Sequence, residues 1–222
     1  MKTDILLQAN VQEALNFEPS LTPAQIGVTV NDGVVTLTGE VDQFSKKTQA
    51  EKIVRRIKGV RAVVEKIQVE LNKSDFKSDS DLAHELIKAL RWNYSVPDDK
   101  IKVTVEDGYV TLDGSVPWDY QRQLARKEVA RVIGVKGIHN NLTLQSASKD
   151  SLEKDAIENA IARHWSLEAD DIYVRVKDNT VTLTGEVQSL YQKDEAERIA
   201  WQAPGVQSVN NFLTVEKQFV KY

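Results

Sequence analysis

The chain has 222 residues, a net charge of −4 and no cysteine. The lack of cysteine excludes disulfides, thiolate metal sites and a thiol nucleophile, and the acidic balance argues against general binding to nucleic acid. Near the N-terminus the longest apolar run covers residues 5–7, which is too short for a secretory signal or a membrane span. We therefore expect a cytoplasmic protein.

One pattern occurs three times along the chain. Its copies are IGVTVNDGVVTLTGEV, IKVTVEDGYVTLDGSV and IYVRVKDNTVTLTGEV, at residues 26–41, 101–116 and 172–187. A Gly-Val pair follows each copy after one amphipathic stretch, and both landmarks recur at offsets of 75 and then 71 residues. Such a repeat indicates one structural unit used three times. We predict domains at residues 1–71, 81–145 and 152–218, joined by linkers at 72–80 and 146–151.

In chain order, each copy begins with a predicted amphipathic helix. Leu7, Val11 and Leu15 recur every four residues and form one apolar stripe, as do Leu82, Leu86 and Leu90, and then Ile157 and Ile161. Two strands follow, in which apolar residues alternate with polar ones, which is typical of a sheet covered on one face. The strands meet at Asp32-Gly33, Asp107-Gly108 and Asp178-Asn179, residues that favour a tight hairpin.

A second helix is predicted near residues 43–58, 118–133 and 189–203, and a last strand begins at the Gly-Val pair. The predicted fold class is therefore α+β, with three αββαβ units, each a three-stranded mixed sheet with two helices on one face. In the second strand, Gly39, Gly114 and Gly185 fall on the inward side, where we expect a helix backbone to approach closely. The other structural positions are the turn residues and the leading glycine of each Gly-Val pair: Gly33, Gly108, Asn179, Gly59, Gly134 and Gly205.

The run V-x-V-x-D-G-x-V-T-L-x-G-x-V, followed by a helix and G-V-x-x-V-x-N-x-L, resembles the BON domain family in three tandem copies. The first copy departs late, with Val64-Glu65-Lys66, and the third departs at its turn, with Asn179. The resemblance implies a bacterial protein linked to osmotic stress and to the cell envelope. It also implies no shared catalytic motif, and roles in binding phospholipid, in assisting other proteins or in sensing potassium.

Side chains that do chemistry in every repeat would occupy one place in all copies. Asp32, Asp107 and Asp178 do so, as do Thr36, Thr111 and Thr182, but turn and sheet positions explain both sets. His84, His139 and His164 are not equivalent, so no repeated metal site is expected. The acidic pairs Asp98-Asp99 and Asp170-Asp171 are weak ion-site candidates; such pairs are more often solvated loop. We expect no enzyme and no cofactor.

The second helix carries the most uneven charge. Residues 43–61 have a local balance of +6, the equivalent residues 118–136 have +3, and residues 189–207 have −1. The basic face is either a solvated surface, or a contact for anionic headgroups, or a contact between the basic first domain and the acidic third domain of another molecule. The candidate lipid-binding residues are Lys47, Lys52, Arg55, Arg56, Lys58, Arg126 and Lys127.

Aromatic residues gather at two places in the units. Phe44, Trp118, Tyr120 and Tyr191 lie near the start of the second helix, and Trp92, Tyr94 and Trp165 follow the first helix. Either they cap the small cores, which we favour, or they mark a contact surface.

Our leading hypothesis is a non-enzymatic, stress-associated protein that binds an anionic phospholipid surface peripherally, with the inner membrane as its location in that case. The alternative is a protein-interaction, chaperone-like or self-assembling scaffold, with ion sensing behind it. Nucleic acid is not an expected partner.

Overall fold

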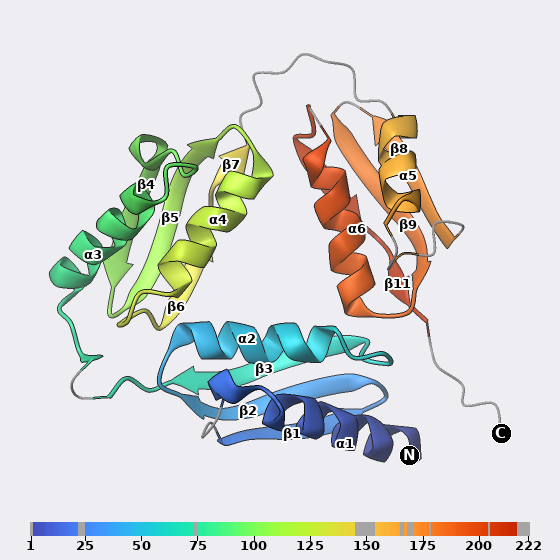
Figure 1. Ribbon diagram of the computed structural model, residues 1–222, viewed down its shortest axis with the longest axis horizontal. Coiled ribbons are helices and arrows are strands. Elements are labelled where there is room, and N and C mark those ends of the chain that lie inside the picture. The colour runs from blue at the N-terminus through green and yellow to red at the C-terminus, as the bar shows by residue number, and fades with distance from the viewer. Residues whose placement is uncertain are drawn as a thin grey trace. The chain divides into compact units, whose positions relative to one another are not determined.

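The computed structural model describes residues 2–21, 25–72, 75–144, 154–164, 167, 171–177, 179–203 and 205–216. Backbone packing groups residues 1–39, 49–67 and 148–222 into one compact unit, and residues 40–48 and 68–147 into another. Figure 1 labels most of the helices and strands of both units.

The elements repeat in the order predicted, αββαβ. The first copy consists of α1 (Lys2–Asn16), β1 (Gln25–Asn31), β2 (Val34–Val41), α2 (Phe44–Arg55) and β3 (Ala62–Val69). The second consists of α3 (Asp79–Trp92), β4 (Ile101–Glu106), β5 (Tyr109–Val116), α4 (Asp119–Ala130), β6 (Gly137–Asn140) and β7 (Thr143–Leu144). The third consists of α5 (Lys154–Ala162), β8 (Ile172–Lys177), β9 (Thr180–Val187), α6 (Leu190–Gln202), β10 (Ser208–Asn211) and β11 (Thr214–Val215).

Each sheet is mixed, with the second strand of the copy in its centre. β5 pairs antiparallel with β4 and parallel with β6 and β7, and β9 pairs in the same way with β8, β10 and β11. Figure 1 shows α3 and α4 over one face of the second sheet, and α5 and α6 over one face of the third. The predicted fold class is therefore confirmed.

The core lies between each sheet and its helices, where the alternation of apolar residues places it. In the second copy Leu82, Leu86 and Leu90 of α3 are at most 1% exposed, and they pack with Val110 and Leu112 of β5. The third copy is built in the same way around Ile157, Ile161, Val181 and Leu183. The apolar stripes of α3 and α5 are thus already used by their own cores.

The hairpin turns take the left-handed backbone that the sequence predicts. Asp32, Asp107 and Asn179 have φ of 48°, 51° and 60°. Asn179 replaces the turn glycine of the other copies, and its side-chain Nδ2 donates to the Gly205 carbonyl at 2.7 Å. Asp178 lies outside the described residues.

A carboxylate from the first helix holds each of the first two turns, a role that our sequence analysis did not assign. The Asp79 carboxylate accepts from the backbone N–H groups of Asp107 and Gly108 at 2.9 and 3.0 Å. Asp4 accepts from Asp32 and Gly33 in the same way, at 3.3 Å each. The signal was present, because Asp4, Asp79 and Asp150 recur at the offsets of the repeat.

Asp79→Ala is therefore expected to lower the free energy of unfolding of the second copy by about 1–3 kcal/mol, because two turn N–H groups lose their acceptor. Hydrogen exchange of peptides from residues 75–144 measures this loss separately from the rest of the chain. Asp99→Ala, which removes an exposed carboxylate of the same copy, is the matched control. Equal losses in the two variants would contradict the role given to Asp79.

The glycines of the second strand correct one expectation. We expected a helix backbone to approach them, but the atom that would meet an added Cβ at Gly114 is the Lys100 carbonyl oxygen, at 2.1 Å. At Gly185 it is the Asp171 carbonyl oxygen, at 1.9 Å. Gly39, Gly114 and Gly185 also share φ of 125–129°, which L side chains rarely adopt. The close contact therefore comes from the residue preceding β4 or β8.

The last strand differs from the prediction in two respects. It begins at Ala62, Gly137 and Ser208 rather than at the Gly-Val pair, and in the second and third copies it is interrupted after Asn140 and Asn211. At both breaks the Asn side-chain oxygen accepts from the N–H two residues later, at 3.2 Å. Its amide group donates to the Arg122 carbonyl in α4 or to the Lys193 carbonyl in α6. These two asparagines thus tie the strand to the second helix.

Candidate functional site

The basic residues on and beside α2 are not equally available. Lys52, Arg56 and Lys58 are exposed, whereas Lys47 is half-buried. Two neighbours outside the candidate set have acidic partners: Lys46 pairs with Asp42 at 2.7 Å and Arg61 with Asp32 at 3.2 Å. Two of the basic residues that contribute to the local charge of +6 are therefore paired with carboxylates of the first copy.

Arg55 is committed to a carboxylate of α6, within the first compact unit. Its Nε and Nη2 atoms donate to the two Asp194 oxygens at 2.7 and 2.6 Å, which is bidentate geometry. The hydrogen bonds to Asp194 raise the pKa of Arg55 above its usual value. Next to it, the Arg56 guanidinium lies 5.4 Å from the centre of the Tyr191 ring, also in α6. Sequence reasoning missed this pairing, because the repeat pattern does not indicate which residues of different copies contact each other.

On α4 the two candidates are open to solvent. Arg126 and Lys127 are exposed, and neither makes an ion pair with another described residue. By contrast, Arg122 pairs with the buried Asp119. Arg131, which our sequence analysis did not select, has a 61% exposed side chain and lies 3.6 Å from Glu128.

The aromatic residues behave differently from one another. Phe44 is buried and packs in the core that contains Leu82, as the core-capping interpretation predicts. That interpretation is wrong for Trp92 and Tyr94, which are 88% and 98% exposed at the end of α3. Trp118 and Tyr120 are 40% and 56% exposed, and Trp165 lies outside the described residues.

Trp92 and Tyr94 flank a residue that contacts the C-terminal part of α4. Asn93, between Trp92 and Tyr94, donates from its side chain to the Glu128 carboxylate at 3.1 Å, and Glu128 in turn contacts Arg131. Lys127 precedes Glu128, on the exposed side of the same turn. We call Trp92, Tyr94, Arg126, Lys127 and Arg131 the aromatic–basic surface.

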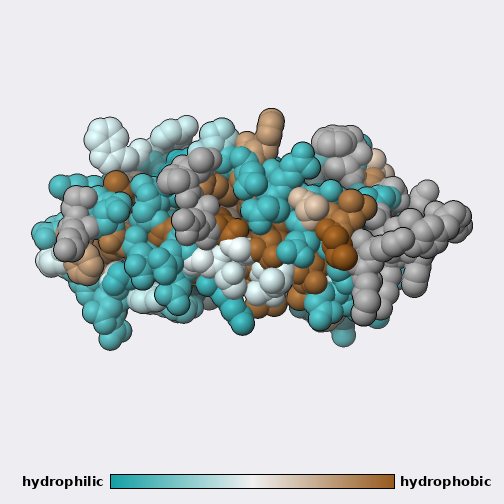
Figure 2. Space-filling view, turned by 90° about the horizontal axis from the view of Figure 1, so that it is seen from below, coloured by the Kyte–Doolittle hydropathy of each residue, from teal (hydrophilic) through white to brown (hydrophobic). Residues whose placement is uncertain are grey.

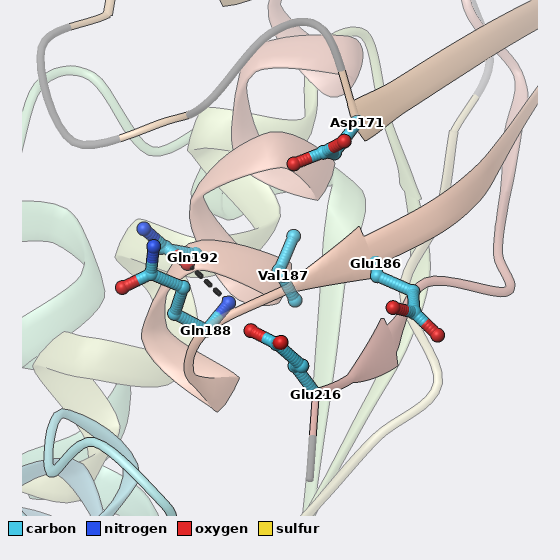
Figure 3. A pocket seen from close by; sticks show the side chains of 6 residues that line it. All are labelled: Asp171, Glu186, Val187, Gln188, Gln192 and Glu216. Carbon is cyan, nitrogen blue, oxygen red and sulfur yellow. Dashed lines mark hydrogen bonds between the residues drawn. The ribbon is translucent and has the colours of Figure 1, made fainter. Parts of the chain in front are cut away.

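Three of the four residues in the acidic pairs lie in the described part of the chain. Asp98 pairs with Arg91 at 3.0 Å, Asp99 is exposed, and Asp170 lies outside the described residues. Asp171 lines a hollow of about 250 Å³ in the third copy, together with Glu186, Val187, Gln188, Gln192 and Glu216. Figure 3 shows these side chains around the hollow, with the Gln188 N–H donating to the Gln192 side chain at 2.6 Å. Among the residues that the structure describes, no three His, Cys, Asp or Glu side chains are placed to hold a metal ion.

His164 has a structural partner in the third copy. Its Nε2 lies 2.9 Å from the Glu195 carboxylate of α6, which Arg198 also contacts. The hydrogen bond from Arg198 is the main reason why the pKa of Glu195 is lowered, with His164 a smaller contribution. This cluster joins the end of α5 to α6 and needs no ligand to explain it.

Comparison with known proteins gives three matches to one family. The BON domain matches residues 3–70, 78–146 and 149–217, which is most of the chain. The chain belongs to the BON domain family. The aromatic–basic surface therefore lies on the second BON domain, and the Arg55–Asp194 pair joins residues of the first and third.

A curated relative is the osmotically-inducible protein Y of Escherichia coli K12, 29% identical over 143 residues, which cover 63% of this chain and 71% of the relative. Among solved structures, the C-terminal domain of CdsD, a structural protein of the type III secretion system of Chlamydia trachomatis, is 15% identical. It covers 95% of this chain and 97% of that chain, with a TM-score of 0.25. The PrgH periplasmic domain is 11% identical over 89% and 98% of the two chains, with a TM-score of 0.21. Scores of this size carry no argument about fold or function.

None of the helices in the described part of the chain has the length and apolar character needed to cross a bilayer. On the face drawn in Figure 2 hydrophilic residues predominate, with hydrophobic side chains gathered mainly in the middle of the view.

Proposed function

We propose that this BON protein binds anionic phospholipid surfaces peripherally, mainly through the aromatic–basic surface of its second domain. The observation that carries the proposal is the exposure of Trp92 and Tyr94, 88% and 98%, next to a basic helix turn. Exposed apolar patches rimmed by polar residues mark protein–protein or membrane interaction sites. Trp and Tyr favour the boundary between water and hydrocarbon, where the ring is shielded and the polar group stays hydrated.

The charges of the same surface suit an anionic partner. Each basic side chain near an anionic membrane contributes about 1 kcal/mol. Arg126, Lys127 and Arg131 together would then supply about 3 kcal/mol, and the two aromatic rings add burial. Because Leu82, Leu86 and Leu90 of α3 are already buried in the core, the helix has no apolar stripe left to insert. Binding is therefore peripheral and weakens with salt.

The link to stress comes from the relative, whose name describes it as osmotically inducible. We propose the same setting here, with the cytoplasmic face of the inner membrane as the location. A scaffold role, and a contact between the basic first domain of one molecule and the acidic third domain of another, stay predictions.

The test is co-sedimentation of the full chain with vesicles of phosphatidylcholine that contain about 30% phosphatidylglycerol. This composition gives the vesicles a negative surface potential of about the physiological size. Arg126→Glu combined with Lys127→Glu is expected to weaken binding at least about 30-fold, since losing two attractions of ~1 kcal/mol already gives that factor. Pure phosphatidylcholine vesicles should bind weakly, and added salt should reduce binding to the anionic vesicles.

The matched control is Arg175→Glu combined with Lys177→Glu, which changes the net charge equally at two exposed positions of β8. This control should keep most of the binding. Equal losses in the two double variants would mean that net charge, rather than this surface, governs association. Absence of binding by the unmodified chain would overturn the proposed function.

A further inference from the structure

We propose that Asp194 of α6 competes with lipid headgroups for Arg55, so that the third BON domain restrains the basic face of the first. The inference rests on the lipid binding proposed above and concerns its regulation. Its basis is a contact inside the first compact unit, where two adjacent arginines of the basic stretch both meet residues of α6.

The Arg55–Asp194 pair has the geometry that a phosphate would otherwise take. A guanidinium group offers parallel N–H donors that match two oxygens of a carboxylate or a phosphate equally well. Here both Asp194 oxygens are used, at 2.6 and 2.7 Å. A headgroup phosphate can bind the Nε–Nη2 edge of Arg55 only after Asp194 has left.

Arg56, although exposed, lies over a ring in the same region. Its guanidinium lies 5.4 Å from the centre of the Tyr191 ring, a cation–π distance. The repeat offsets relate Arg56 to Arg131 and Tyr191 to Tyr120 in the second domain. Arg131 and Tyr120 are 61% and 56% exposed.

The Arg55–Asp194 pair is specific to the first and third domains and is not required by the BON fold. At the positions equivalent to Arg55 and Asp194 the second domain has Ala130 and Gln123, which cannot form an ion pair. Because the second domain folds without such an ion pair, the BON fold itself does not require the Arg55–Asp194 pair. The contact is thus free to serve regulation.

The restraint is weak enough to be reversible. The two side chains keep 30% and 44% of their surface exposed, and ion pairs of this kind typically contribute less than ~1 kcal/mol and are screened by salt. Removing the competitor should therefore raise lipid affinity about 2- to 5-fold, not by orders of magnitude.

The experiment compares Asp194→Asn with Asp155→Asn in the full chain, using the same phosphatidylglycerol vesicles. Both variants remove one negative charge from the third domain, but Asp155 is an exposed residue of α5 that makes no ion pair with a described arginine. Asp194→Asn is expected to bind about 2- to 5-fold tighter than the unmodified chain, and more tightly than Asp155→Asn. In an Arg55→Gln background, Asp194→Asn should give no gain beyond that of Asp155→Asn, because the arginine it releases is absent.

Two outcomes separate this inference from the proposed function. If the unmodified chain binds and the two Asn variants bind equally well, competition by Asp194 is wrong while lipid binding stands. If neither the unmodified chain nor Asp194→Asn binds anionic vesicles, the proposal of lipid binding is wrong. Asp194 then has no headgroup to compete with for Arg55. Circular dichroism of each variant confirms that the fold is kept.

Discussion

Gly114→Ala is expected to destabilise the second BON domain by about 3 kcal/mol or more, among the largest effects of any single methyl group in this chain. An added Cβ would lie 2.1 Å from the carbonyl oxygen of Lys100, a backbone atom fixed by the start of β4. The backbone at Gly114 also has φ of 129°, which alanine rarely adopts. Both strains act together, so β4 would have to separate from β5 at this point.

Gly137→Ala is the control within the same domain. Its Cβ would meet the Tyr109 ring at 2.7 Å, but this ring is 50% exposed and can rotate away. Hydrogen exchange of peptides from β4 and β5 is the measurement, because it reports the stability of this domain alone. Protection should fall strongly in Gly114→Ala and much less in Gly137→Ala. Similar protection in both would show that the contact with Lys100 does not constrain the strand.

Asn211→Asp is expected to cost the third domain about 2–4 kcal/mol, although it changes one NH2 group to oxygen. The Asn211 amide donates to the Lys193 carbonyl at 2.9 Å and to the Glu197 carboxylate at 3.1 Å. A carboxylate at this position donates nothing, and it faces the like-charged Glu197 carboxylate and the carbonyl oxygen of Lys193. The side-chain oxygen can still accept from the Leu213 N–H, so the strand break itself remains.

Asn210→Asp provides the same chemical change one residue earlier, on the exposed side of β10. Thermal unfolding, monitored by hydrogen exchange of peptides from α6 and β10, should separate the two variants. Asn211→Asp should lose a clear part of its stability and Asn210→Asp little. If Asn210→Asp lost as much stability, added negative charge on an acidic domain would explain the effect instead of the lost hydrogen bonds.

The sequence predicted the fold well because its signals are local and occur three times. The apolar stripe of Leu82, Leu86 and Leu90, the Asp-Gly turns and the alternating strands each depend on residues close in the chain. The identity of the close contact at Gly114 could not be read in this way, because the Lys100 carbonyl meets it across the sheet. Periodicity shows which face a residue is on, not which atom lies opposite.

The candidate site was predicted less completely, for a related reason. Lys127 and Arg126 were selected as candidates from local charge, and both are exposed. The Arg55–Asp194 pair joins residues 139 positions apart, which no charge count can place. Trp92 and Tyr94 were expected to cap a core, but that core is already filled by aliphatic side chains such as Leu86 and Leu90.

The environment of Trp92 on binding tests the central claim most directly. A chain in which Trp118, Trp165 and Trp201 are replaced by phenylalanine reports on Trp92 alone, since the sequence has four tryptophans. On mixing with phosphatidylglycerol vesicles its fluorescence should shift to shorter wavelength and be quenched by brominated lipid, as the indole leaves water for the interface. Co-sedimentation with those vesicles without any change in Trp92 fluorescence would contradict the aromatic–basic surface as the lipid contact.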